Sequence, residues 1–234
     1  MDRALPRYHG CVCGRYVLTV TGRVLARLFD LDEVPDVEAR YNIAPTQPVP
    51  IIRTGTIGRR LDTVRWGLVP PWAKDPTIGS RMINARAETA AEKPSFRSAF
   101  RRRRCLVPAN GFYEWRREET RKQPYLVRFA DGRPFAFAGL WESWRQPDGT
   151  ALESCVIVTT EPNSVVARLH DRMPAILPPE SHGEWLDAAE GSPERLRTLL
   201  VPYPPEEMEA YRVSLRVNNP ANDDALCAKP AAAR

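Results

Sequence analysis

The 23 prolines of this chain are scattered along its whole length, and they restrict the fold more than any other sequence feature. Proline has no backbone N–H and a fixed φ angle, so it is poorly tolerated inside helices and central strands. We therefore expect short helices, short strands and many loops. The chain has 234 residues, which is enough for one large domain or two small ones.

Alternation of apolar and polar residues indicates β-strands in the middle of the chain and again near its end. The expected strands lie at residues 63–68, 125–129, 135–140, 155–159 and 211–217. Helices are expected at residues 21–29, 164–169 and 192–200, the last because Ser192 can cap a helix that begins with Pro193. This order favours α+β: a single domain around a twisted antiparallel, barrel-like β core with short peripheral helices.

Arginine supplies 30 of the 34 basic residues, and the net charge is +5. Two compatible explanations exist for this bias: codon usage in a GC-rich genome, and recognition of phosphates by the bidentate guanidinium. The charge permits binding to nucleic acid without demonstrating it. No apolar run reaches the ~18 residues of a membrane helix, and the N-terminus lacks a secretory signal, so we expect a cytoplasmic protein.

The cysteines fit neither a disulfide framework nor a zinc site. Their number is odd and their spacing irregular, and the chain holds only three histidines and no second closely spaced cysteine pair. The five are Cys11, Cys13, Cys105, Cys155 and Cys227. We interpret four of them as ordinary core residues and single out Cys13 for the reason that follows.

Six dense polar and aromatic segments occur in a fixed order, and each is a weak signal alone. They are Cys13-Gly14-Arg15-Tyr16, Tyr41-Asn42-Ile43-Ala44-Pro45, Trp66-Gly67-Leu68-Val69-Pro70-Pro71-Trp72, Asn84-Ala85-Arg86-Ala87-Glu88-Thr89, Gly111-Phe112-Tyr113-Glu114-Trp115 and His170-Asp171-Arg172-Met173-Pro174. Together they make the chain resemble the SOS response-associated peptidase (SRAP) family, also called abasic-site processing proteins. The resemblance runs from Cys13 to about Asp223, where Val217-Asn218 and Asn222-Asp223 resemble the C-terminal signature of the family.

The resemblance implies a protein of the DNA damage response that binds abasic sites in single-stranded DNA. An N-terminal cysteine would form a thiazolidine with the aldehyde of the lesion, and the resulting DNA–protein crosslink would shield it. Lyase activity and self-processing by a peptidase (hydrolase) activity are implied as well. No metal or organic cofactor is expected. We expect a monomer without membrane contact, associated with the nucleoid when it binds DNA.

The chain departs from the family at its start, where twelve residues precede Cys13. One explanation is a misassigned start, with Val12 as the true initiator; the other is a propeptide removed by self-cleavage. We therefore divide the chain into residues 1–12, a SRAP domain at 13–227 and a disordered tail at 228–234. The position matters because only a terminal Cys13 has both an α-amine, with a reference pKa of about 7.7–8.0, and a thiol, with a reference pKa of about 8.5.

The resemblance also implies roles for other residues. Glu114 would move the proton that opens the closed sugar of the lesion, His170 would stabilise the departing sugar oxygen, and Asn84 would hold the reacting groups. With Cys13 these form the expected catalytic set. The expected DNA-binding residues, through phosphate contacts or base stacking, are Arg15, Trp72, Arg86, Trp115, Thr159 and Arg172.

Two alternatives remain open at this stage. In the first, the protein is a cysteine peptidase that acts on proteins, with Cys13 as nucleophile and His170 as base. In the second, it is a nucleic-acid-binding module without chemistry. The second leaves the presence of Glu114 and His170 in matching motifs without an explanation.

Overall fold

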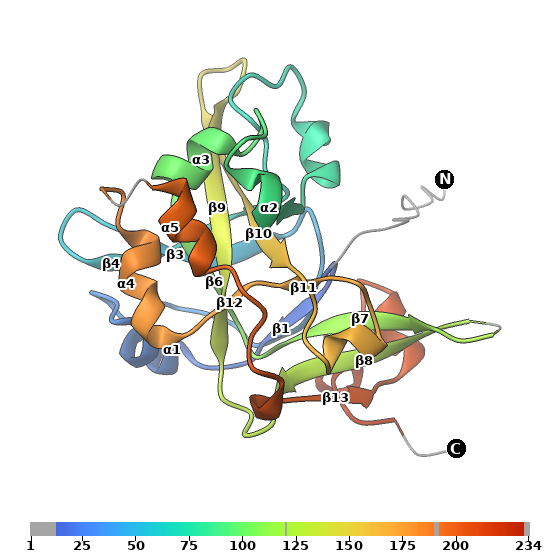
Figure 1. The fold of residues 1–234 in the computed structure, drawn as a ribbon. Helices are drawn as coiled ribbons and strands as arrows, with labels where there is room; N and C mark the ends of the chain where they lie inside the picture. The colour runs from blue at the N-terminus through green and yellow to red at the C-terminus, as the bar shows by residue number, and fades with distance from the viewer. Residues whose placement is uncertain (1–12, 120, 190–191, 232–234) are drawn as a thin grey trace.

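A closed five-stranded β-barrel forms the centre of the computed structural model, which describes residues 13–119, 121–189 and 192–231 (Figure 1). Residues 1–12, interpreted above as a misassigned start or propeptide, lie outside the described residues. The barrel strands, in order around the ring, are β3 (Pro48–Thr54), β4 (Arg59–Trp66), β10 (Ala151–Thr160), β9 (Phe135–Arg145) and β6 (Arg104–Ala109). The ring closes because β6 pairs with β3 and β9 pairs with β10.

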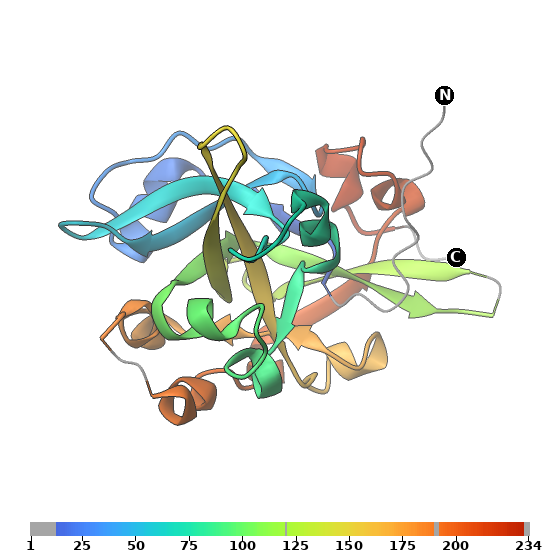
Figure 2. The ribbon, with the colours of Figure 1, turned by 90° about the horizontal axis from the view of Figure 1, so that it is seen from above.

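A second, antiparallel sheet packs beside the barrel. Its strands, in spatial order, are β13 (Met208–Arg212), β8 (Lys122–Phe129), β7 (Gly111–Arg117), β1 (Tyr16–Leu18) and β2 (Arg40–Ile43). Three short strands extend the barrel edges: β5 (Asn84–Arg86), β11 (Met173–Pro174) and β12 (Ile176–Leu177). The β7–β8 hairpin projects from the body of the molecule in both ribbon views (Figures 1 and 2).

The helices are short and lie around the outside of the sheets (Figure 2). The α-helices are α1 (Gly22–Phe29), α2 (Ala87–Ala90), α3 (Arg97–Arg102), α4 (His182–Leu186) and α5 (Pro193–Thr198). The 3-10 helices are η1 (Pro76–Arg81), η2 (Val166–Arg168), η3 (Pro179–Ser181), η4 (Pro205–Glu207), η5 (Leu215–Asn218) and η6 (Ala225–Cys227). The longest helix among the described residues has eight residues, as the scattered prolines predict.

Aromatic side chains from β1, β4 and β9 pack against one another in the hydrophobic core. The ring of Tyr16 lies edge-on to Trp66 and to Phe137, with centroid separations of 5.5 and 6.0 Å. The indole N–H of Trp66 donates to the carbonyl of Ile83 at 2.9 Å, so its one polar atom is satisfied inside the core. Burial of each such side chain contributes roughly 2–3 kcal/mol, which holds β1 firmly against the barrel.

The α+β, barrel-like fold is confirmed, with one difference in strand direction. β10 runs parallel to both β4 and β5, so the barrel is mixed rather than wholly antiparallel. The predicted strand at residues 211–217 is partly wrong. β13 ends at Arg212, and the side chain of Ser214 accepts a hydrogen bond from the backbone N–H of Arg216, which starts the 3-10 helix η5.

The helix predictions are confirmed with shorter bounds. α1 matches the predicted 21–29 segment, whereas 164–169 contains only the 3-10 turn η2. Ser192 caps α5 as expected, because its side chain accepts from the backbone N–H of Arg195. No helix within the described ranges is long and apolar enough to cross a membrane.

The predicted disordered tail is ordered over its first four residues. The carbonyl of Ala228 accepts a hydrogen bond from the Tyr211 hydroxyl at 3.0 Å, and the backbone N–H of Ala231 donates to Arg212 at 2.8 Å. Pro230 forms a bridge with Val213. These contacts attach the segment to the end of β13; residues 232–234 lie outside the described residues.

Candidate active site

The first described residue lies against a buried carboxyl group. β1 pairs with β7 so that Tyr16 is opposite Phe112, and this register carries Cys13 beyond the strand end toward Glu114. The backbone nitrogen of Cys13 donates to Oε1 of Glu114 at 2.8 Å. Cys13 is 0% and Glu114 2% exposed. Two residues separated by 101 positions in the chain therefore meet in a site closed to water.

Burial raises the pKa of Glu114 to about 8. Desolvation is the largest cause, because a carboxylate loses its hydration in the protein interior. Hydrogen bonds from the backbone of Cys13 and Trp115 oppose the rise, and the negative charge of Asp171 adds to it. Glu114 can thus carry a proton near neutral pH, as a general acid–base group requires.

Asn84 and Thr159 lie on adjacent parallel strands, β5 and β10, two positions apart in the register. In this pairing Asn84 is opposite Ile157, and Thr159 is opposite Arg86. The Thr159 side chain is buried, and its hydroxyl donates to the carbonyl of Ala85 at 3.5 Å, near the limit for a hydrogen bond. Three of the predicted site residues are therefore brought together by one strand pair.

His170 follows the η2 turn, and its ring is hydrogen-bonded to the backbone two residues further along the chain. Its Nδ1 accepts a hydrogen bond from the N–H of Arg172 at 3.1 Å. Oδ1 of Asp171 is 2.8 Å from the same Nδ1, and the Asp171 side chain is 88% exposed. Since the charge of Asp171 acts on Glu114, this loop is electrostatically coupled to the carboxyl group beside Cys13.

Arg172 is oriented by a carboxylate that the sequence interpretation did not assign. Both of its terminal nitrogens donate to Glu88, at 2.6 and 2.9 Å, and one also donates to the carbonyl of Thr159 at 2.7 Å. β11 pairs with β10 next to these residues, with Pro174 opposite Thr159. Glu88 lies inside the Asn84–Thr89 motif, so that motif was the signal that could have identified it.

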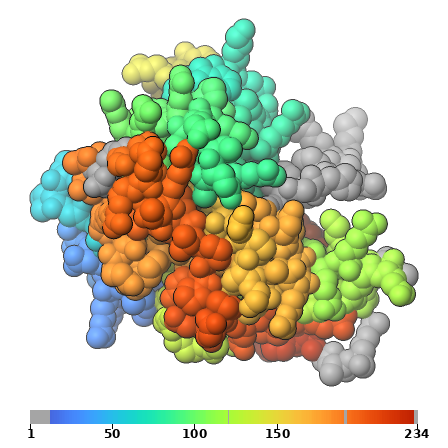
Figure 3. Space-filling view, in the orientation of Figure 1, coloured from blue at the N-terminus to red at the C-terminus, as the bar shows by residue number. Residues whose placement is uncertain are grey.

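The segment around His170 reaches the outer surface. Figure 3 shows it in yellow-orange, between the green residues of α2 and the light green β7–β8 hairpin. Arg86 is exposed beside it, and the Trp72 side chain is 56% exposed on the loop before η1. Arg86 and Trp72 are therefore accessible to a bound molecule.

Two of the predicted DNA-binding residues instead contact the C-terminal segment. Arg15 donates from Nη1 to Oδ1 of Asn42 and to the carbonyl of Val217, at 2.8 and 2.7 Å. The indole N–H of Trp115 donates to Oδ1 of Asn218 at 2.8 Å. These contacts give both side chains a structural partner; their contact with DNA stays a prediction.

The buried amide of Asn42 explains the C-terminal motif. Its Nδ2 donates to the carbonyls of Val217, Asn219 and Asn222, at 3.1, 3.1 and 2.7 Å. Asp223 in turn accepts from the backbone N–H groups of Tyr41 and Asn42 at 2.5 and 2.8 Å, and from the guanidinium of Arg40. We refer to Asn42, Asp223 and their partners as the C-terminal clamp. It holds residues 217–223 against β2.

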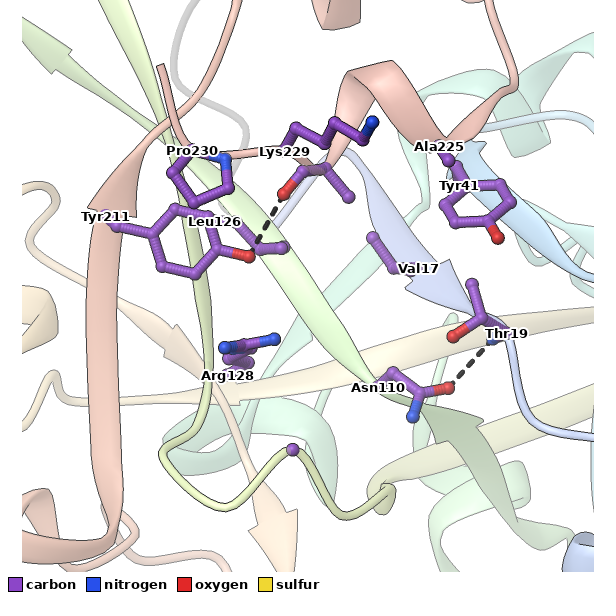
Figure 4. Close-up of a pocket in the computed structure, with 12 residues that line it drawn as sticks. Val17, Thr19, Tyr41, Asn110, Leu126, Arg128, Tyr211, Ala225, Lys229 and Pro230 are labelled. Carbon is purple, nitrogen blue, oxygen red and sulfur yellow. Dashed lines mark hydrogen bonds between the residues drawn. The ribbon is translucent and has the colours of Figure 1, made fainter. Parts of the chain in front are cut away.

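A pocket on the opposite face of the second sheet is separate from this site (Figure 4). Adjacent strand residues point to opposite faces, and Tyr113 packs with Val17 and Leu126 on the face that Glu114 does not occupy. Two of the lining residues are hydrogen-bonded to each other: the Thr19 N–H donates to Asn110 at 2.8 Å. Within the described segments there is no group of three or more metal-ligating side chains.

Known proteins with the same arrangement of segments cover nearly the whole chain. The family model described as SOS response associated peptidase (SRAP) matches residues 12–220. Abasic site processing protein YoqW of Bacillus subtilis strain 168 is 45% identical over 216 residues, which cover 91% of this chain and 96% of that protein. Abasic site processing protein YedK of Escherichia coli strain K12 is 32% identical over 181 residues, covering 75% of this chain and 79% of that protein.

Solved structures agree in fold. A crystal structure of a protein from Bacteroides thetaiotaomicron superimposes with a TM-score of 0.84 and 30% sequence identity, covering 94% of this chain and 100% of that one. A second, from Bordetella bronchiseptica, gives a TM-score of 0.75 at 28% identity over 87% of this chain and 100% of that one. On the family match and the 45% identity to YoqW, this chain belongs to the SOS response associated peptidase family.

Proposed function

We propose that this protein processes abasic sites in single-stranded DNA by forming a covalent bond through Cys13, once residues 1–12 are absent. The observation that carries the proposal is the 2.8 Å contact between the Cys13 nitrogen and the buried carboxyl of Glu114. The names of the relatives YoqW and YedK support the class of substrate. This contact supports the proposal because the chemistry needs a group that can transfer protons beside that nitrogen.

The reaction requires both functional groups of a terminal cysteine. The α-amine of Cys13 adds to the open-chain aldehyde of the lesion, and loss of one water gives an imine. The thiol then adds across the C=N bond, sulfur to carbon and hydrogen to nitrogen, which closes a thiazolidine ring. Ring closure is intramolecular and therefore has a high effective concentration. The products are the crosslink and one water molecule.

Glu114 is suited to move protons in these steps. It can give a proton to the sugar ring oxygen when the hemiacetal opens and take one from the amine as the imine forms. An ammonium group in place of the amide at 2.8 Å would lower the carboxyl pKa from its buried value, because opposite charges favour ionisation. His170 and Asn84, on neighbouring segments, would act on the oxygens of the same sugar.

The backbone at Cys13 favours loss of the preceding peptide. Its φ angle is 43°, in the left-handed region that non-glycine residues rarely occupy. A strained conformation of this kind costs on the order of 1–3 kcal/mol, and the torsion no longer exists once residue 12 is gone. Hydrolysis of the bond between residues 12 and 13 consumes one water and leaves the amine. A misassigned start at Val12 would give the same terminus.

Binding of the strand would use the exposed groups around the buried pair. Arg86 can contact a phosphate, and Trp72 can stack on a base, which contributes ~1–3 kcal/mol per base. Arg172 can contact a phosphate with the part of its guanidinium that Glu88 and Thr159 leave accessible. These contacts are independent of sequence, as recognition of a lesion at any position demands.

A gel assay tests the proposal. Single-stranded DNA with one uracil is incubated with the protein, with and without uracil glycosylase, and separated under denaturing conditions. We expect a shifted band that requires the glycosylase, is lost in Cys13→Ala and persists in Cys227→Ala. Intact mass of the reacting protein should begin at Cys13. Adduct formation by protein that still carries residues 1–12 would contradict the proposal.

The same assay separates the alternatives. A cysteine peptidase would cleave a protein substrate and leave no DNA adduct. A binding module without chemistry would retain DNA in a salt-sensitive manner with no denaturant-resistant band.

A further inference from the structure

The contact between Arg172 and His170 influences where the proton sits on the neutral ring. A neutral imidazole has one N–H donor and one bare nitrogen. The hydrogen bond from the N–H of Arg172 to Nδ1, at 3.1 Å, favours a neutral ring that carries its proton on Nε2, whereas the carboxylate of Asp171, 2.8 Å from the same Nδ1, favours a proton on Nδ1. In the first tautomer, Nε2–H is the group that can donate to a substrate oxygen. The position of the Arg172 backbone therefore influences which nitrogen donates.

Asp171 competes for the same nitrogen. Its Oδ1 lies 2.8 Å from Nδ1 and could accept a proton from it only if Nδ1 carried one. The competing tautomer would break the hydrogen bond from Arg172 and would present a bare Nε2 to the site. The Asp171 side chain is largely exposed, so burial does not restrict its movement toward Nδ1. A second restraint must keep the Arg172 backbone in place.

Glu88 supplies that restraint. The Arg172 side chain is only 13% exposed, and its fork is closed by two hydrogen bonds to Glu88 and one to Thr159. Bidentate pairs of this kind fix a guanidinium in position and orientation. α2 begins directly after β5, so Glu88 stands on an element that is anchored to β10. The carboxylate thus ties the 170–172 loop to the barrel.

We infer that Glu88 is a positioning residue that acts through Arg172 to keep the neutral His170 ring protonated on Nε2. The inference rests on the proposed function for its consequence in catalysis, because only there does His170 act on the sugar. The tautomer itself is a property of the unliganded protein. It can be measured without DNA.

The test compares two glutamates of the same region. Glu88→Gln removes one carboxylate from the Arg172 fork. Glu92→Gln is the matched control. Glu92 follows α2, is paired with Arg197 at 2.6 Å and, among the described residues, forms no hydrogen bond or ion pair with the 170–172 loop. Nitrogen-15 NMR of histidine-labelled protein, with His170→Gln used only for assignment, identifies the protonated ring nitrogen in each variant.

We expect Nε2–H in the unaltered protein and in Glu92→Gln, and a mixture of both tautomers in Glu88→Gln. At saturating abasic DNA, the rate of adduct formation should fall roughly tenfold in Glu88→Gln and stay unchanged in Glu92→Gln. An unchanged tautomer in Glu88→Gln would overturn the inference, whether or not the rate falls. If the unaltered protein forms no adduct while the tautomer responds, the proposed function fails and the positioning role stands.

Discussion

Two glutamates of this protein show how the environment of a side chain determines its protonation state and its role. Glu114 is buried beside Cys13, and burial raises its pKa to about 8. Glu88 is about half exposed; burial alone would raise its pKa, but the hydrogen bonds from Arg172 outweigh this and lower it. The first can exchange protons near neutral pH, and the second stays charged and holds a partner.

Replacement of Glu114 should have the largest effect and tests the first half of this comparison. In Glu114→Gln we expect the rate of adduct formation to fall by roughly 10²–10⁴, because a positioned acid–base group contributes about that factor. Affinity for undamaged single-stranded DNA should not change. Single-turnover kinetics and fluorescence anisotropy measure the two quantities. Equal losses in rate and affinity would show that Glu114 binds DNA rather than moves protons.

The same replacement should alter stability in a pH-dependent manner. In uncleaved protein the folded pKa of about 8 exceeds the reference value of 4.5. The folded state therefore loses stability as pH rises from about 4.5 to about 8, because the unfolded chain releases its proton first. Glu114→Gln removes this loss.

We expect Glu114→Gln to be more stable than the unaltered protein by several kcal/mol at pH 9, with about 5 kcal/mol as the upper limit, and no gain at pH 4. Urea denaturation at both pH values measures the free energy of unfolding. A gain of the same size at pH 4 would mean that the effect arises from packing and not from ionisation.

Glu88 should give the opposite sign and the smallest effect. Its lowered pKa contributes stability above the reference value of 4.5, and this contribution is lost as pH falls through the folded value. Because the carboxylate is 47% exposed, solvent screening limits the effect of Glu88→Gln to about 0.5 kcal/mol at pH 7. Urea denaturation in low and high salt should show the difference shrinking with salt. A stabilised variant would contradict the comparison.

The sequence predicts the central residues of the candidate site, Cys13 and Glu114, better than it predicts Glu88, which positions a neighbouring side chain. Cys13 and Glu114 lie in separate motifs, and a resemblance to the family suffices to pair them. Glu88 lies in a motif as well, but a charged residue one position after the start of a helix has no pattern that distinguishes it from a solvated one. Its role depends on Arg172, which is 84 residues away.

Long-range pairing explains the remaining differences. The parallel register of β10 with β4 and β5 leaves no local signal, because apolar alternation is the same for both strand directions. The alternation at 211–217 continues past Arg212, yet the side chain of Ser214 accepts a hydrogen bond from the backbone N–H of Arg216 and ends the extended conformation. The motif around Arg15 likewise gives no local signal for its partner Val217, which is 202 residues distant.

The C-terminal clamp has a consequence for the order in which the protein is made. Arg15, two residues after Cys13, donates a hydrogen bond to the carbonyl of Val217, near the other terminus. The hydrogen bond between Asn42 and Asp223 can form only after the ribosome has released almost the entire domain. Contacts of such sequence separation form late and slowly. The contacts that fix the segment around Cys13 can therefore form only after nearly the whole chain has been synthesised. A truncated translation product would contain Cys13 without these contacts.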